Sequence, residues 1–514
     1  MGDRCGTAHG NRYDPTGPVF ISYRQSDGTE LAKCLDRFLR AGGLVPWRDL
    51  VDLPPGETAR RVHEAFEEGI AAAVLIVTPE IRDSQFVPAE ELPELLKLEQ
   101  EPHDFSLLVL NTIPKQDETA FNDGRSQGDD VDAGQPSPDD ASADHPLGGC
   151  GRSKKPIDLS APDWLLKTTG EPLKNLKQYG LGECRQLYRD LLHRRLGHLM
   201  RPAERCLPIG LPAGVVAAIS SALGWLFGDR GIGDGEVTIQ TQTRPIPDAY
   251  TRRSGTTRLG REHDLAIRLR QDPTTGIPAA EDYRHLKETL PIMVDGLYSY
   301  GVSRVTLTGG GHFSLGWVLG AALPVTRQGG LRIVDLGGNE WADTSSDGDR
   351  ETYKAVVKDS GKGENSGRRI AVLIRNSNEQ NQAPFDELKD SCDESFEIVI
   401  QSKDKQSQGG HFYPSNEGAR LAKEIADKLR ERGAGRELHI AWSAAVSLAP
   451  LVARRTNTLN CVLYELTQNP LVNRQRYQKV LRVAAGMPHG PIVEVFDKVA
   501  RPSKTTRVEG ETRD

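Results

Sequence analysis

An acidic side chain that could take part in catalysis follows an apolar run in the first part of the chain. Ser84 is followed by Phe86 two positions later and by Glu90 four positions after that, downstream of the apolar residues 73–77. A fixed carboxylate can stabilise positive charge that develops in a transition state, so Glu90 is a candidate catalytic residue. Glu91 is the alternative candidate, because the two glutamates are adjacent and a shift of one residue in the assignment of the motif exchanges them. Taken alone, such a glutamate is most often a solvated helix residue.

Small residues form two similar turns later in the chain, GGGHFS at 309–314 and SAAVS at 443–447. Each turn precedes a helical pattern, and free backbone N–H groups at a helix N-terminus attract phosphate. Two equivalent turns favour a ligand with several phosphates over a dinucleotide, since no G-x-G-x-x-G opens a helix here. Tight packing is the alternative explanation for the glycines.

Aromatic and basic side chains in the same region could stack on bases or neutralise phosphates. A role in the core or on the surface is the alternative for each of them. The candidate ligand-binding residues are Gly309, Gly310, Gly311, His312, Phe313, Arg375, Trp442 and Ser443.

The elements that must position Glu90 alternate between short strands and helical periods from 18 to 200. We expect strands at 19–21, 44–47, 73–77 and 105–110, with helices between them. One helix ends at Gly42 and Gly43, and another opens at Pro88, which is allowed in the first turn. This alternation is typical of a parallel α/β layer structure.

The elements that must position the two turns form an internal repeat within a second α/β region at 237–465. RVTLTGGGHFSLGWVL from Arg304 aligns with ELHIAWSAAVSLAPLV from Glu437, and each copy reads as a strand, a small-residue loop and a helix. A further strand follows each copy, at 331–336 and 461–465. The repeat predicts two Rossmann-like lobes, in which ligands bind beyond the carboxyl ends of the strands.

The first region resembles a TIR domain, which has a flavodoxin-like fold. The resemblance rests on VFISYRQSDG (19–28), VPWRDLVDLPPGE (45–57, the BB loop) and AAAVLIVTPEIRDSQFVPAEEL (71–92), although Phe86 and Val87 replace the commoner Trp-Cys pair. It implies either a signalling adaptor or an NAD+ hydrolase, with Glu90 as the acid that stabilises a ribosyl cation. The substrate-binding residues that it implies are Tyr23, Arg24, Trp47, Asp49 and Phe86.

The second region resembles SAVED domains, the paired CARF-like sensors of cyclic oligonucleotides in bacterial anti-phage signalling (CBASS). VTLTGGGHFSLGWVLG (305–320) and HIAWSAAVSLAPLVARRTNTLNCVLYEL (439–466) carry this resemblance. It implies a cyclic oligonucleotide activator, most simply a cyclic trinucleotide such as cyclic triadenylate. It also implies ligand-driven head-to-tail assembly, in which the BB loop of one protomer completes the site of its neighbour.

Together the two resemblances predict a TIR domain at 17–200, a connector at 201–235 and a SAVED domain at 236–500. The expected activity is NAD+ glycohydrolysis that releases nicotinamide, with NAD+ as substrate and no separate cofactor or metal. Three alternatives stay open: a TIR scaffold without catalysis, a cyclase that makes cyclic ADP-ribose, and a membrane-tethered sensor.

The composition of the chain limits the classes of partner that we expect it to bind. The formal net charge is −7, and residues 115–146 alone carry nine acidic and two basic residues, so the rest of the chain is neutral and offers no broad field for DNA. We expect 115–150 to be a disordered acidic insertion. Seven scattered cysteines without CxxC spacing argue against disulfides and zinc and favour the cytoplasm. The uncharged stretch 210–228 is expected to be a packed connector, with a membrane span as the alternative.

Overall fold

The structure is a computed structural model, and the residues it describes lie in fourteen ranges. These are 13–48, 66–67, 69–115, 156–167, 173–200, 235–244, 263–326, 329–343, 352–359, 368–377, 383–403, 415–467, 475–487 and 490–497. Asp49, most of the expected acidic insertion and the stretch 210–228 lie outside these ranges. Among the described residues no helix is long and apolar enough to cross a membrane.

The N-terminal region contains a five-stranded parallel sheet in the order β2-β1-β3-β4-β5. Its strands are β1 (Val19–Ser22), β2 (Pro46–Trp47), β3 (Ala72–Val77), β4 (Leu107–Asn111) and β5 (Gln178–Tyr179). The predicted parallel α/β structure is confirmed, and the order 2-1-3-4-5 is that of flavodoxin-like folds. Every residue of β3 is buried, which explains why its sequence is a continuous apolar run.

Helices cover both faces of this sheet. They are α1 (Gln25–Ala41), α3 (Leu92–Gln100), α4 (Ala161–Leu166) and α5 (Cys184–Leu199), with short turns η1 (Pro79–Asp83), η2 (Val87–Glu91), η5 (Leu173–Asn175) and η6 (Leu181–Glu183). The helix α1 ends as predicted, because Gly42 is its C-cap and Gly43 takes a positive φ of 82°. The helix predicted to open at Pro88 instead starts with η2, a single π-helical turn.

The first of two further lobes contains a sheet in the order β10-β9-β8-β6-β7. Its elements are β6 (Glu236–Gln242), β7 (Leu265–Arg268), α8 (Ala280–Ser299), β8 (Arg304–Gly310), α9 (Phe313–Ala322), β9 (Gly330–Val334) and β10 (Glu340–Ala342). All neighbouring strands are parallel except the β9–β10 pair.

The second lobe contains a seven-stranded sheet in the order β11-β13-β12-β14-β15-β16-β17. Its strands are β11 (Tyr353–Asp359), β12 (Arg369–Asn376), β13 (Glu394–Ser402), β14 (Glu437–Ser443), β15 (Asn460–Leu466), β16 (Tyr477–Val483) and β17 (Ile492–Val495), and its helical segments are α10 (Ala383–Asp390), η10 (Ser415–Glu417), α11 (Gly418–Gly433) and α12 (Leu448–Ala453). The predicted repeat is confirmed, since β8–α9–β9 and β14–α12–β15 have the same order and parallel pairing.

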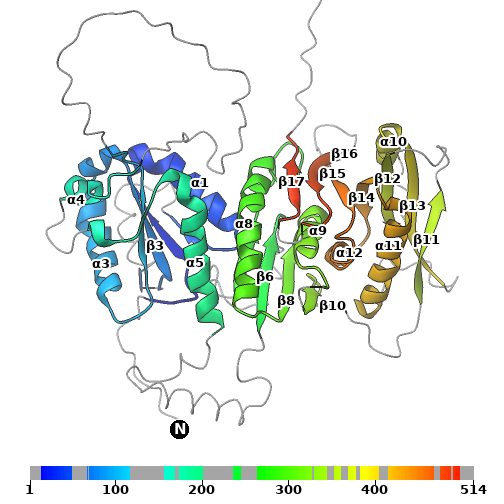
Figure 1. Cartoon of the computed structure of the whole chain (residues 1–514), viewed down its shortest axis with the longest axis horizontal. Helices are drawn as coiled ribbons and strands as arrows, with labels where there is room; N and C mark the ends of the chain where they lie inside the picture. The colour runs from blue at the N-terminus through cyan, green and yellow to red at the C-terminus, as the bar shows by residue number, and fades with distance from the viewer. Residues whose placement is uncertain are drawn as a thin grey trace, which may run out of the picture.

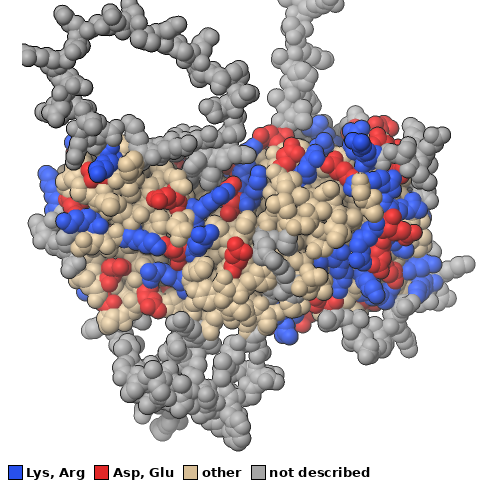
Figure 2. Space-filling view, in the orientation of Figure 1, with Lys and Arg blue, Asp and Glu red and all other residues tan. Residues whose placement is uncertain are grey.

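The three sheets lie in a row, with α8 between the N-terminal region and the first lobe and α9 beside α12 between the two lobes (Figure 1). One apolar core runs through all three, and its members include Ile21, Leu286, Leu307 and Ile440. The N-terminal region is therefore packed directly onto the first lobe. On the face shown in Figure 2, Lys and Arg side chains are interspersed with Asp and Glu.

Candidate functional site

A cavity of about 440 Å³ opens at the carboxyl end of β1. Its lining is Phe20, Ile21, Tyr23, Arg24, Gln25, Trp47, Ser84, Gln85, Phe86, Val87 and Glu91. Tyr23 and Arg24 directly follow β1, Trp47 lies in β2, and Phe86 and Glu91 lie in the turns after β3. Ligands of open parallel sheets bind at this edge, so the cavity lies where the topology predicts a site.

The acid that lines the cavity is Glu91, whereas Glu90 is exposed and is not among the lining residues. Glu91 is 5% exposed, and the Ser22 hydroxyl donates a hydrogen bond to its Oε2 at 2.5 Å. The placement follows from η2, where the Leu92 N–H donates to the Val87 carbonyl, five residues back. A π-turn holds one more residue than an α-turn, so it rotates the following side chains away from the positions that α-helical spacing predicts. Of the two adjacent glutamates, Glu91 therefore lines the cavity and Glu90 does not, and the catalytic role of either one stays a prediction.

Flat aromatic surfaces form much of the cavity wall. Trp47 stacks on Phe20 with ring centroids 5.1 Å apart and an interplanar angle of 16°. Tyr23 is buried, and Phe86 is half-buried against the same wall. These three predicted residues thus lie together, as a site for a planar base or a pyridine ring requires.

Arg24 brings a positive charge to the cavity. Its Nη1 forms an ion pair with Glu80 Oε2 at 2.7 Å, and its side chain is 23% exposed. The Ser26 hydroxyl donates to the same carboxylate oxygen at 3.3 Å. Glu80 thereby fixes the guanidinium at the cavity rim, where its other N–H groups can meet the phosphates of a ligand.

A carboxylate held by a hydroxyl between aromatic walls can stabilise a cation that forms beside it. In the described part of the chain, no group of three or more His, Cys, Asp and Glu side chains is arranged to hold a metal ion. Sequence reasoning missed Ser22, whose only signal was its place at the end of a predicted strand, directly before Tyr23.

The glycine turn after β8 is shaped by packing. Gly309 takes a positive φ of 96°, and a Cβ there would lie 2.3 Å from the Thr241 carbonyl oxygen of β6. His312 is buried: its Nδ1 lies 2.7 Å from the Thr243 hydroxyl, and its Nε2 lies 3.1 Å from the Gly276 carbonyl oxygen. Burial, assisted by the charge of Arg244, lowers the pKa of His312 to about 3. His312 is thus a neutral core residue, and the structure does not offer it to a ligand.

The N-terminus of α9 already contacts a carboxyl group of the protein. The backbone N–H and the hydroxyl of Ser314 donate to Glu465 Oε1 of β15, at 2.8 and 2.5 Å. Burial raises the pKa of Glu465, while these bonds from Ser314 act in the opposite direction. The Tyr283 hydroxyl lies 2.5 Å from the Ser314 hydroxyl and completes a network between the lobes. The side chain of Glu465 therefore occupies the position at this turn where a phosphate is expected.

The equivalent turn before α12 is also closed, because the N–H groups of Leu448 and Ala449 donate to the carbonyls of Ala445 and Val446. Phe313 and Trp442 are buried and stack on each other, with centroids 5.8 Å apart and an angle of 10°. Their aromatic faces join the two lobes, so the base-stacking role expected for them is not supported.

The Arg375 side chain is also bound to other residues of the protein. It is 7% exposed, and its Nε donates to Glu397 Oε2 of β13 at 2.8 Å. Gly310 is buried, and Gly311 and Ser443 are half-buried at the ends of β8 and β14. Of the eight residues proposed for the ligand, Gly309, Gly311 and Ser443 keep partial exposure, and none of the eight lines the cavity at β1.

Comparisons with known proteins bear on the second region. Residues 298–483, from the end of α8 through β16, match the family model of SAVED, described as "SMODS-associated and fused to various effectors sensor domain". No curated protein matches the chain.

Two solved structures are similar to this chain at low identity. The Acinetobacter baumannii Cap4 SAVED/CARF-domain containing receptor with the cyclic trinucleotide 3'3'3'-cAAA is 9% identical, over 90% of this chain and 99% of that chain, with a TM-score of 0.37. The Moraxella osloensis Cap4 SAVED/CARF-domain containing receptor is 9% identical, over 88% of this chain and 98% of that chain, with a TM-score of 0.33.

Proposed function

We propose that this chain, whose residues 298–483 match the SAVED sensor family, is an NAD+ hydrolase that a cyclic oligonucleotide activates. The observation that carries the hydrolase half is the cavity at β1, where Glu91 lies with Tyr23, Arg24, Trp47 and Phe86. This combination suits a dinucleotide, since aromatic faces accept its rings and a guanidinium accepts its phosphates.

The proposed reaction breaks the C–N bond between nicotinamide and ribose. The electron pair leaves with nicotinamide, which becomes neutral, and the ribosyl group becomes an oxocarbenium-like cation. Water then adds to the anomeric carbon and loses a proton, giving ADP-ribose, nicotinamide and H⁺. The Glu91 carboxylate, held by Ser22, stabilises the cation, and no strong general acid is needed because the leaving group is already cationic.

The sensor half of the proposal rests on the SAVED family match and on the two repeated lobes. We take the activator to be a cyclic oligonucleotide, with cyclic triadenylate as the first probe, in a CBASS-type response. Its binding drives head-to-tail assembly of protomers, an arrangement that produces open filaments when the contacts do not close into a ring.

Product analysis tests the proposed function. The full chain is incubated with NAD+ and cyclic triadenylate, and the products are separated by chromatography. Nicotinamide with linear ADP-ribose is the expected result. Cyclic ADP-ribose would assign a cyclase instead, and unchanged NAD+ across a panel of cyclic oligonucleotides would leave the scaffold alternative.

A further inference from the structure

Five arginines line a second cavity, of about 520 Å³, between the N-terminal region and the first lobe. The lining consists of Asp36, Arg37, Arg40, Gln242, Thr243, Arg244, Arg268, Leu269, Arg270, Gln271 and Asp282. The helix α1 supplies one wall, and the carboxyl ends of β6 and β7 supply the other. Two aspartates oppose the five arginines, so the lining carries a positive excess.

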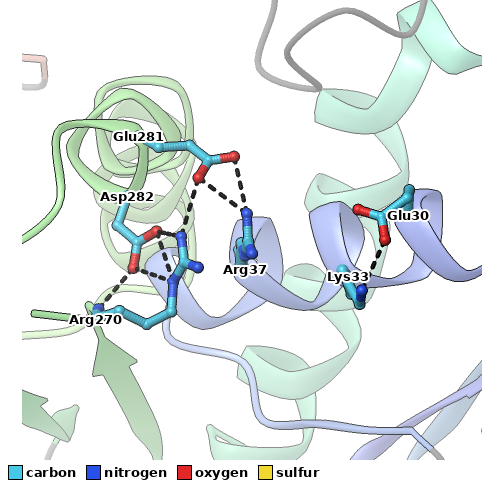
Figure 3. Close-up of polar contacts among 6 residues, drawn as sticks. All are labelled: Glu30, Lys33, Arg37, Arg270, Glu281 and Asp282. Carbon is cyan, nitrogen blue, oxygen red and sulfur yellow. Dashed lines mark hydrogen bonds and ion pairs between the residues drawn. The ribbon is translucent and has the colours of Figure 1, made fainter. Parts of the chain in front are cut away.

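Three of these arginines have acidic partners. Arg40 pairs with Asp36 through two hydrogen bonds of 2.9 and 3.1 Å. Arg37 of α1 and Arg270 both point at the Glu281 carboxylate of α8, at 2.9 and 3.0 Å, and Arg270 also bonds Asp282 at 2.6 Å (Figure 3). The Arg37–Glu281 pair connects α1 to the first lobe, and all these pairs hold the guanidinium groups in place.

The other two arginines, Arg244 and Arg268, form no ion pair with an acidic side chain of the described residues. For the side chains of Arg244 and Arg268, the described residues provide neither a hydrogen bond nor an ion pair, and the Nε of Arg268 is a buried donor with no acceptor among them. Burial and the nearby charge of Arg40 lower the pKa of Arg268. An anion in the cavity would relieve this repulsion and supply the missing acceptors.

We propose that this cavity binds the phosphate groups of a nucleotide, with Arg268 and Arg244 as the principal donors. The site lies beyond the carboxyl ends of β6 and β7, which is the edge where open α/β sheets hold ligands. Guanidinium groups are well suited to it, because their fixed fork can make two parallel bonds to one phosphate.

The same helix borders both cavities. Gln25, the first residue of α1, lines the cavity at β1, while Asp36, Arg37 and Arg40 near its other end line the arginine cavity. A phosphate held between Arg268 and α1 therefore contacts the element that also borders Glu91's cavity. This route for coupling sensor and effector rests on the proposed function, whereas the phosphate site itself does not.

Titration calorimetry on the full chain tests the site with two probes, inorganic pyrophosphate and cyclic triadenylate. The Arg268→Glu variant is expected to bind either probe at least tenfold more weakly, and Arg268→Gln is expected to lie between this variant and the wild type. Arg304→Gln is the matched control, since Arg304 is an arginine of the same sheet outside the cavity and should leave both affinities unchanged. Equal melting temperatures establish that the variants are folded.

The possible outcomes separate the two proposals. Loss of pyrophosphate binding in Arg268→Glu supports the site even if NAD+ is never cleaved, in which case the proposed function fails alone. If cyclic triadenylate binding falls as well, the activator itself is the nucleotide. Unchanged affinity for both probes in Arg268→Glu, or no binding of either probe to the wild type, overturns the site.

Discussion

At the scale of single residues, two adjacent glutamates differ in their position at the cavity at β1. Glu91 is buried beside Ser22, and the adjacent Glu90 faces solvent, although the two side chains are chemically identical. Substitutions of Glu90 and Glu91 can therefore be compared directly, because the two side chains differ only in their location.

Glu91→Gln should nearly abolish NAD+ cleavage, because a neutral amide cannot offset the charge of the ribosyl cation. A loss of about 3 kcal/mol of transition-state stabilisation, roughly a hundredfold in rate, is the expected scale. Glu90→Gln should keep the wild-type rate. Nicotinamide release by ligand-activated protein measures both, and the reverse ranking would return the catalytic role to Glu90.

The buried His312 should make stability depend on pH. Its pKa is about 3 in the folded chain and about 6.5 when unfolded, so the unfolded state binds more protons between these values. The stabilising effect of keeping His312 neutral is fully present above pH 6.5 and is lost as the pH falls toward 3. At pH 5 the loss is about 2 kcal/mol relative to pH 7.5.

Thermal melting at pH 7.5 and 5.0 measures this effect against His312→Gln. The variant lacks the titrating ring, so its melting temperature should fall less on acidification than that of the wild type. The other buried histidines are common to both proteins. Equal falls in the two proteins would show that His312 is not held neutral by the fold.

Residue-level prediction from sequence singled out Tyr23, Arg24, Trp47 and Phe86, which the structure brings to one cavity, while their role in binding a substrate stays a prediction. It did not separate Glu90 from Glu91, because hydrophobic periodicity assumes α-helical spacing and carries no sign of a π-turn. Nor did it place Trp442, whose partner Phe313 lies in the other lobe. Such a contact depends on how the lobes pack.

At the scale of elements, the crossing of α9 and α12 joins the two lobes through a glycine. A Cβ on Gly320 would lie 2.2 Å from the Pro450 carbonyl oxygen of α12, so the two backbones can approach only without a side chain there. The helices are the equivalent elements of the repeat, and their close packing explains why small residues recur in both.

Alanine substitutions at two helical glycines should have opposite effects on the melting temperature. Gly320→Ala should destabilise the fold by about 1–3 kcal/mol, because the clash with Pro450 outweighs the better helix propensity. Gly197→Ala in α5 should stabilise it by about 0.5–1 kcal/mol, since its Cβ would make an ordinary 3.5 Å contact with Tyr300. Stabilisation by both would contradict the packing of α9 on α12.

The strands β1, β3 and β4 were predictable from their apolar runs, and β8 and β14 were predictable from the internal repeat; all five form where expected. The internal repeat also predicted α9 and α12. The strands β16 and β17, which extend the second sheet in antiparallel fashion, were not predicted. These two strands are short and mix polar with apolar residues. Their local sequence therefore does not indicate which sheet they join.

At the scale of the whole molecule, α1 and α8 join the N-terminal region to the first lobe. The Arg37–Glu281 pair and the backbone bond from the Ala266 N–H to the Gly43 carbonyl, 2.7 Å long, fix this contact. Sequence patterns predicted separate units and could not predict the contact, because it lies between elements far apart in the chain.

Assembly should make activity depend on protein concentration, since a ligand shifts an equilibrium only through its differential affinity for the assembled state. Activity per protomer should fall on dilution, and light scattering should show larger particles with cyclic triadenylate than without it. Constant specific activity on dilution, with unchanged particle size, would place activation within one protomer.

The most direct test of the account is the rate of NAD+ loss by the full chain with and without cyclic oligonucleotides. Cyclic di-, tri- and tetranucleotides are compared at one protein concentration, with Glu91→Gln as the catalytic control. The account predicts rapid NAD+ loss with a cyclic trinucleotide, almost none without ligand, and loss that is roughly a hundredfold slower in the variant. Loss at the same rate without any ligand, or no loss with any member of the panel, would contradict it.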